Sequence, residues 1–578
     1  MSLKYYAELA VAVIAGLLSV NFLFQKLVLD YNRDLTPVAL SEQANITTVR
    51  KKNETALYRN FLVPIGFPLT TGLGLSLGYK IRNGNFMDVW KAIMDVTGAK
   101  GNYVSLPGGS AKKDTVRKYS LPEINGMANK IITDVYEKYD VNEVGLNVSA
   151  GTLPGFVISI ASMIHSVRSE GGKGLLHFLA AVPRQRNEKV EVLVIDSWQA
   201  FGMLNKSEEW YKLVIVCDDD ASAMKPSEVN DMSNVVTWDS VISGYTESTK
   251  FEYDPPKDNS DELKPLFNVT SMCNQVTAFN QLNLVSSVSS FIKTFPLHHE
   301  LSDSDVITDI RDTFTVAKNN VQIWPKVFSV LLLGGSAQFV TASDVTLDSL
   351  AKTTLLVCEP KTLTTITNLV KESNGASPPL QGVKLSLATA FLSEGVMVKV
   401  AKIHTPQLEQ LRAIYLGEEL SQEARILSFA SKIPSYSKGQ IQSKFTTAQL
   451  NQFRAVFGAR LVVELYCPFI VMGPISETNF YDYRIFSPSV DAQVTCVGPL
   501  NTSLEGKMVN IEGNPNMDVE QRQGMLCIRG FTIGRPLGDE RLAQAAKLSE
   551  DVAGSEGWIP LTGVYGLWGQ DGCLYIYN

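Results

Sequence analysis

The chain has 578 residues, 45% of them hydrophobic and 19% charged, which is long enough for several hydrophobic cores. Its net charge of -7 argues against general nucleic-acid binding, and its longest basic run, Arg50 to Lys52, is typical of a solvated loop. Scattered cysteines without a C-x-x-C spacing, and only one adjacent histidine pair, indicate reduced cytosolic thiols and no metal site.

The N-terminus carries the membrane signal of the sequence. Leu9 to Phe24 is an apolar run interrupted only by Ser19 and Asn21. With its flanks the run reaches about 25 residues, enough to span roughly 30 Å of hydrocarbon as a helix. Its bulky end and the absence of a small-residue cleavage site favour an uncleaved anchor over residues 1–30 rather than a signal peptide. A hairpin or a helix lying in one leaflet is a third possibility.

The orientation of this anchor follows from the charges beside it. Lys26, Arg33 and Arg50 to Lys52 come after the apolar run, and only Lys4 and the amino terminus come before it. The positive-inside rule then predicts a single-pass anchor with the large domain in the cytosol. Six N-x-S/T sequons oppose this weakly. We expect the endoplasmic reticulum membrane, with lipid droplet, peroxisome and mitochondrial surface left open.

Residues 31–119 are polar and rich in turns, and we expect them to form an N-terminal cap. The glycine cluster from Gly66 to Tyr79 lacks the G-K-[ST] ending of a phosphate loop. A second glycine-containing turn runs from Leu106 to Asp114. Both are typical of loops between elements rather than of an anion site.

From Ser120 the pattern becomes a regular alternation of helices and strands. Apolar residues at helical spacing predict helices over residues 120–139 and Phe156 to Ser169. This alternation predicts an α/β core over residues 120–495, with parallel sheets covered on both faces, and a β-rich closing lobe over residues 496–578. The predicted strands are Val144 to Ser149, Val190 to Ile195, Leu213 to Cys217, Val327 to Leu333, Leu355 to Val357, Leu411 to Leu416 and Arg460 to Leu465.

The last 25 residues resemble the segment that closes the large domain of adenylate-forming enzymes, the acyl-CoA synthetases and their relatives. Residues 411–432 are similar to the strand and helix after that family's "LR-x-x", and residues 524–535 to its G-E-L-x-x-R-G motif. The resemblance covers about 450 residues and implies parallel sheets flanked by helices plus a small β-barrel lobe. The matching residues at the end are Gly557, Trp558, Thr562, Gly563, Gly566, Asp571, Gly572, Leu574, Tyr575 and Ile576.

The family's phosphate loop, roughly T-S-G-T-T-G-x-P-K-G, is degenerate here. By its position before a helix, the matching segment runs from Thr270 to Phe279. Thr270 and Ser271 remain, but the glycines, the proline and the lysine are gone. Side chains then stand where a backbone must approach the anion, and each lost charged hydrogen bond costs about 1.5–3 kcal/mol of binding.

Two further nucleotide motifs depart from the family. For Y-G-x-T-E, one alignment starts at Tyr466 and loses the glutamate, while the other ends at Glu477 and puts Met472 at the tyrosine. The aspartate that grips the ribose in the family is Val564, which cannot accept hydrogen bonds from hydroxyls. The chain also ends at Asn578, where the family's small C-terminal domain would follow.

Together these departures imply a degenerate member of the family. We expect no catalytic residue, no cofactor and no metal, and a membrane-anchored scaffold that binds a lipid or acyl ligand or a protein partner. Two alternatives remain: a fatty acid–CoA ligase whose small domain is supplied in trans, or a structural subunit of a membrane complex.

Overall fold

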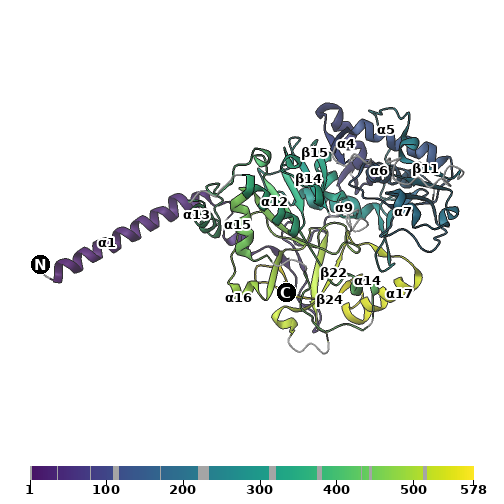
Figure 1. The fold of residues 1–578 in the computed structure, drawn as a ribbon. Helices are drawn as coiled ribbons and strands as arrows, with labels where there is room; N and C mark the ends of the chain where they lie inside the picture. Colours follow the sequence, from purple (N-terminus) through teal and green to yellow (C-terminus); the bar gives the residue numbers. More distant parts are fainter. Residues whose placement is uncertain are drawn as a thin grey trace.

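A long N-terminal helix projects from a body built of two α/β layers and a β-rich lobe (Figure 1). The structure is a computed structural model. It describes residues 3–35, 37–77, 80–107, 116–169, 171–218, 233–311, 321–373, 380–430, 432–441, 445–511 and 517–578.

The first sheet has eight strands in the order β11-β10-β9-β7-β8-β12-β13-β23. Its strands from β11 to β12 are parallel, and β13 and β23 add antiparallel pairings at one edge. The bounds are β7 Glu143–Asn147, β8 Leu175–Phe178, β9 Val190–Ile195, β10 Leu213–Val216, β11 Val235–Thr237, β12 Pro265–Thr270, β13 Val276–Asn280 and β23 Arg535–Pro536.

The second sheet also has eight strands, in the order β19-β18-β17-β16-β14-β15-β5-β6. It is parallel from β18 to β5 and antiparallel at both edges. The bounds are β5 Tyr103–Pro107, β6 Val116–Ser120, β14 Val306–Arg311, β15 Ser336–Thr341, β16 Leu355–Cys358, β17 Ala413–Glu419, β18 Arg460–Tyr466 and β19 Ser476–Glu477.

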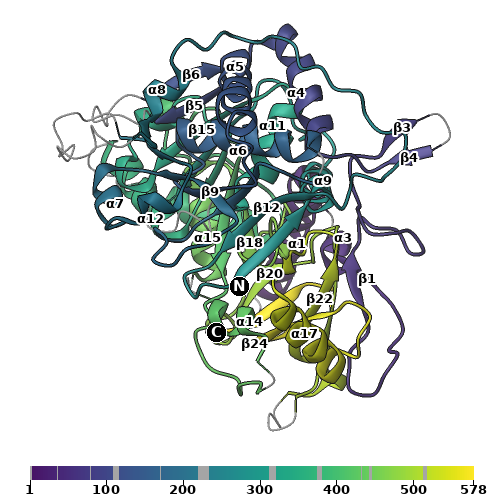
Figure 2. The ribbon, with the colours of Figure 1, turned by 90° about the vertical axis from the view of Figure 1, so that its right-hand side faces the viewer.

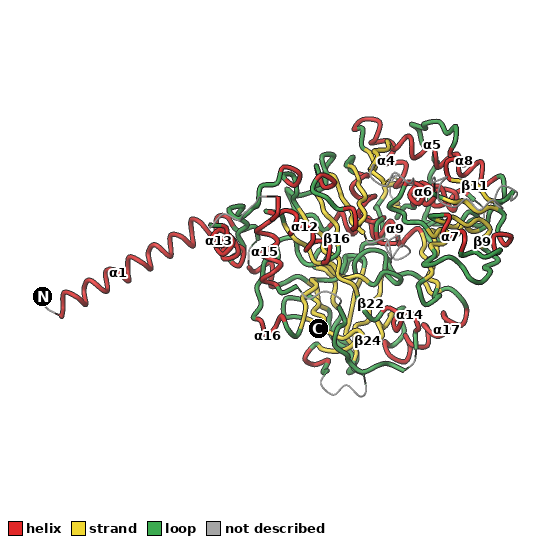
Figure 3. The backbone as a smooth tube through the Cα atoms, viewed as in Figure 1, coloured by secondary structure: helices red, strands yellow, loops and turns green. Residues whose placement is uncertain are grey.

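Helices lie between these sheets and cover their outer faces, as the red and yellow segments of Figure 3 show. α4, α6, α9 and α11 pack against one another and form the main core between the two sheets. α12 and α15 cover the outer face of the second sheet. The bounds are α4 Phe86–Lys100, α5 Leu121–Ile131, α6 Leu153–Arg168, α9 Gln281–Lys293, α11 Trp324–Leu332, α12 Pro360–Ser373, α13 Gln381–Ser393, α14 Glu423–Ser428, α15 Thr447–Phe457 and α17 Asp539–Leu548.

The third sheet has seven strands, in the order β1-β2-β21-β22-β24-β25-β20, and forms the lobe drawn mainly in yellow in Figure 2. Its pairings are antiparallel, and β1 and β2 bring the N-terminal segment to its edge. The bounds are β1 Ala44–Ile46, β2 Tyr58–Asn60, β20 Val494–Gly498, β21 Leu504–Val509, β22 Gln523–Gly530, β24 Ile559–Trp568 and β25 Leu574–Tyr577.

The predicted N-terminal helix is present as α1, Leu3–Phe24. Within the described residues, one stretch, Glu8–Asn32, is long and apolar enough to cross a membrane, and its most apolar part is not buried against the body. Helix and strand predictions hold at most of the other positions, including β9, which matches its predicted bounds residue for residue.

One predicted strand is wrong. Residues 327–332 lie in α11, a buried helix between the sheets that is apolar around most of its circumference, and Leu333 follows its end. Such a run looks the same in a buried strand and a buried helix. Pro325, in the first turn of α11, is the local signal that favours the helix.

Candidate functional site

The segment aligned with the phosphate loop is the hairpin between β12 and β13, directly before α9. Its backbone donors are turned inward: Ser271 N donates to Gln275 O at 2.9 Å, and Asn274 N donates to Ser271 O at 2.9 Å. Gln275 N also donates to Ser271 Oγ at 3.2 Å. Ser271 itself is buried, while Met272 is 74% exposed. These N–H groups close the turn and do not point at a common anion position.

The Thr270 hydroxyl is engaged within the first sheet. His177 Nε2 lies 2.6 Å from Thr270 Oγ1, and His177 Nδ1 lies 3.3 Å from Glu143 Oε2. His177 and Glu143 are both buried, so this chain of polar groups satisfies side chains inside the sheet.

Tyr466 and Glu477, which the two alignments of the Y-G-x-T-E motif select, both lie in one buried cluster around Glu464 on β18. Tyr466, at the end of the same strand, donates its hydroxyl to Glu464 Oε2 at 2.9 Å. Lys326 from α11 forms an ion pair with Glu464 at 2.9 Å and bonds the Tyr466 hydroxyl. Glu477 on β19 pairs with Glu464 across the strands. The structure thus brings Tyr466 and Glu477 together through residues that sequence reasoning did not single out.

The buried surroundings of Glu477 change the pKa of its carboxyl group. Burial, and then the charge of Glu464, raise the pKa of Glu477 to about 8, with Lys326 opposing the shift. One cation thus serves two buried carboxylates, and it pairs with Glu464. Glu477 therefore keeps its proton at neutral pH. The sequence did carry a signal for this cluster, since Lys326 and Glu464 are opposite charges inside apolar runs, and buried charges require partners.

A cleft of about 290 Å³ lies at the carboxyl ends of β16 and β17, where open α/β sheets usually bind ligands. Its lining is acidic, with Glu359, Glu418 and Glu419 against Lys361. The Tyr466 ring lies beside this cleft. A Cβ atom added to Gly417, which lines the cleft, would be 3.4 Å from that ring. Among the described residues, no group of three or more His, Cys, Asp or Glu side chains is placed to hold a metal ion.

Val564 lies in β24 and is completely buried. The neighbouring backbone is covered by residues 432–441. Gln440 Nε2 donates to Tyr565 O at 3.0 Å, and its Oε1 accepts from Tyr565 N. The Tyr565 hydroxyl donates to Pro434 O at 2.7 Å. Val564, which the sequence resemblance aligns with the ribose aspartate, is therefore part of a packed core.

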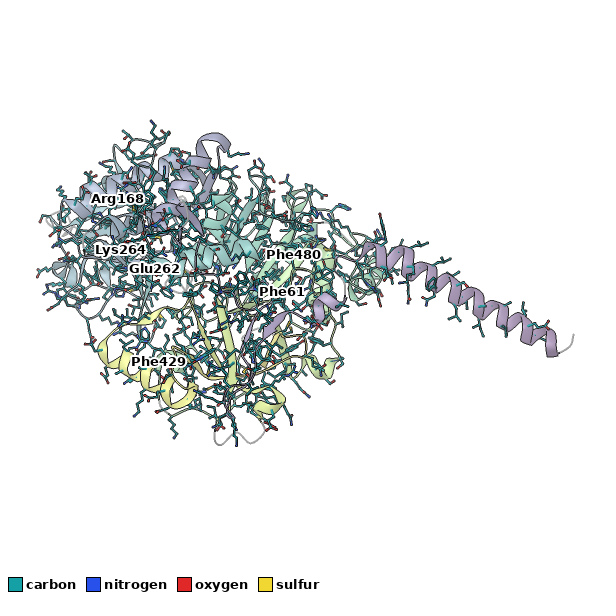
Figure 4. The ribbon with its side chains drawn as sticks, turned by 180° about the vertical axis from the view of Figure 1, so that it is seen from behind. Phe61, Arg168, Glu262, Lys264, Phe429 and Phe480 are labelled. Carbon is teal, nitrogen blue, oxygen red and sulfur yellow. The ribbon has the colours of Figure 1, made fainter. Side chains whose placement is uncertain are left out.

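A second cavity, of about 270 Å³, lies on the inner face of the second sheet, close to the segment that follows α1. Leu35 and Ala39 line it beside aromatic side chains, with Lys293 as its basic and Glu477 as its acidic residue. Figure 4 labels two of its aromatic residues, Phe61 and Phe480, in the part of the body nearer α1. No short motif marks this cavity, and sequence reasoning did not find it.

The chain is 48% identical over 578 residues to the uncharacterized protein YHR045W of Saccharomyces cerevisiae, and the alignment covers 100% of both chains. The chain belongs to the YHR045W family. No family model matches the sequence.

Solved structures of adenylate-forming enzymes match most of the chain. Apo MatB from Rhodopseudomonas palustris matches with a TM-score of 0.52 and 12% identity, covering 85% of this chain and 78% of MatB. The luciferase-like enzyme of the Zophobas morio mealworm matches with a TM-score of 0.53 and 13% identity, covering 88% of this chain and 98% of that enzyme. This member of the YHR045W family therefore has the adenylate-forming fold, as the sequence predicted.

Proposed function

We propose that this protein is anchored to a membrane by α1 and acts by binding an acyl ligand, without adenylating it. The observation that carries the proposal is the covered position of Val564. Residues 432–441 lie over this part of β24 and bond its backbone, so a ribose has no hydrogen-bond acceptor and no access there.

The other nucleotide positions support the same conclusion. The N–H groups of Ser271, Asn274 and Gln275 in the β12–β13 hairpin bond within its own turn, whereas a phosphate needs several such donors converging on one point. The cleft at the ends of β16 and β17 has three glutamates and one lysine in its lining, which disfavours a triphosphate. These residues do not fit ATP, and we derive no step through it.

The apolar cavity supports an acyl chain as the ligand. Its lining is dominated by Phe61, Phe295, Phe480 and other apolar side chains, and its volume of about 270 Å³ is near the lower end of small-molecule sites. Glu477 contributes a neutral carboxyl because its pKa is raised to about 8. Lys293, whose Nζ donates to Thr70 Oγ1 at 3.1 Å, is the one cation of the lining and suits an anionic head group.

The location of the ligand site beside the anchor supports a membrane source for this ligand. Leu35 and Ala39 line the cavity only a few residues after the candidate span ends at Asn32. The basic residues that follow the apolar run favour a cytosolic body, and the endoplasmic reticulum is the organelle we propose.

Two measurements on the full-length protein in mild detergent test the proposal. ATP–pyrophosphate exchange with fatty acids of different lengths should stay at the buffer level, and any exchange above it would overturn the non-adenylating part. Mass spectrometry of co-purifying small molecules should find acyl lipids. A bound nucleotide would instead favour a ligase completed in trans, and an empty protein in a stable complex would favour a structural subunit.

A further inference from the structure

α13, Gln381–Ser393, is a nearly uncharged helix with one face open to solvent. Its inner face packs on the body through the buried Ala388 and Leu392. Its outer face exposes Val383 to 65% and Leu387 to 47%, and Leu380, directly before the helix, to 62%. A helix face that exposes several large apolar side chains is normally covered by a partner surface.

This helix lies where α1 leaves the body. The rings of Phe24 and Phe391 are 6.2 Å apart, which joins the end of α1 to α13. Beyond the helix, Asp34 N donates to Gly395 O at 3.1 Å, and Arg33 Nε donates to Glu394 O at 2.8 Å. Figure 1 shows α13 at the end of the body from which α1 projects.

The length of α1 sets the depth of this contact. Charged residues bound its apolar part at Glu8 and Lys26. The 17 residues between them span about 26 Å at 1.5 Å per residue, close to the roughly 30 Å of a hydrocarbon core. Phe24 lies near the body-side end of this apolar part, and Phe391 is held at the same level.

We infer that the outer face of α13 lies in the head-group region of the membrane that α1 spans, as a second, interfacial contact. The inference rests on the membrane anchor of the proposed function. Lys384, the only charged side chain in α13, is exposed and meets anionic head groups from this position. Two contacts fix the tilt of the body, and they hold the cavity beside Leu35 and Ala39 close to the bilayer surface.

Photo-crosslinking from single positions tests this contact in the full-length protein reconstituted into nanodiscs of phosphatidylcholine and phosphatidylserine. The crosslinker p-benzoylphenylalanine replaces Leu387 on α13, Leu17 within α1, or Leu263 as a matched exposed leucine. Leu263 is 69% exposed and lies beside Glu262 and Lys264, which Figure 4 shows at the end of the body away from α1. Lipid adducts are counted by mass spectrometry, and Val383 serves as the second α13 position if the Leu387 variant does not fold.

Lipid adducts at Leu17 and Leu387, each several-fold above Leu263, are the expected result. Adducts at Leu17 with Leu387 and Val383 both at the Leu263 level would overturn the α13 contact and leave the anchor standing. A protein adduct in place of lipid at Leu387 would also overturn it. Background levels at all positions would overturn both the contact and the anchor.

Discussion

Glu464 and Glu477 lie directly opposite each other across the antiparallel pairing of β18 and β19. Both are buried, and the cation that reaches them, Lys326, pairs with Glu464 at 2.9 Å. Glu477 Oε1 has no hydrogen-bond partner among the described residues. Burial and the neighbouring Glu464 therefore raise the pKa of Glu477 to about 8, so Glu477 presents a neutral carboxyl to the cavity at neutral pH.

The raised pKa of Glu477 predicts a pH-dependent stability. Its pKa rises from 4.5 to about 8 on folding, so between these values the unfolded chain ionises while the folded protein keeps its proton. Stability contributed by this group is thus full below pH 4.5, falls as the pH rises at up to about 1.4 kcal/mol per unit, and levels off above pH 8. Glu477→Gln should remove this slope, and thermal unfolding midpoints at pH 5, 6.5 and 8 measure it.

The matched control is Glu372→Gln, an exposed glutamate at the end of α12. It should follow the wild-type pH profile. If Glu477→Gln lowered the midpoint equally at all three pH values, Glu477 would be ionised in the folded protein and the assignment of its proton would be wrong.

Lys326 and Glu464 should behave as a coupled buried pair. Lys326→Met leaves the Glu464 carboxylate without its cation, and the expected loss is about 3–5 kcal/mol of unfolding free energy. Glu464→Gln added to Lys326→Met should recover a large part of it, since no buried charge then remains unpaired. A double-mutant cycle in denaturant measures the coupling, and a coupling near zero would contradict the ion pair.

Local signals in the sequence predicted most helices and strands, and the resemblance to adenylate-forming enzymes predicted how they are assembled. The run from Val190 to Ile195 is apolar except for Glu191 and rich in β-branched residues, which predicts a buried strand, and β9 has those bounds. The segment that forms the hairpin before α9 was selected from the sequence by its position directly before a helix. The run from Val327 to Leu333 failed because a short buried apolar run looks the same in a strand and in a helix.

The candidate site could not be predicted in the same way because its parts come from distant segments. The cavity draws Leu35, Phe61, Lys293, Val462 and Glu477 from different elements, and no local pattern joins them. The pKa of Glu477 depends on its strand register with Glu464 and on a lysine from a helix that precedes both in the chain. Nothing in the sequence singled out the outer face of α13 either. Its position beside α1 is known only from the contact of Phe391 with Phe24.

Restoring the family's aspartate should not restore nucleotide binding. Val564→Asp places a carboxylate in a fully buried site covered by residues 432–441, and the expected cost is about 3–5 kcal/mol of stability. Val564→Ala, which only removes methyl groups, should cost about 2 kcal/mol. Thermal-shift titration with ATP and magnesium should move neither midpoint. Stabilisation of Val564→Asp by ATP, as mass action requires of a binder, would show that the site is open.

Closing the cavity at its membrane side should empty it of lipid. Ala39 lines the cavity in α3, Pro37–Ser41, whereas its neighbour Val38 does not line it and is exposed. Ala39→Phe adds a ring at the lining, so co-purifying acyl lipid should fall several-fold in quantitative mass spectrometry. Val38→Phe adds a similar ring outside the cavity and should retain the lipid. A cavity of about 270 Å³ that holds an acyl chain has little room for an added phenyl ring. Equal lipid in both variants would therefore mean that the acyl chain occupies another part of the protein.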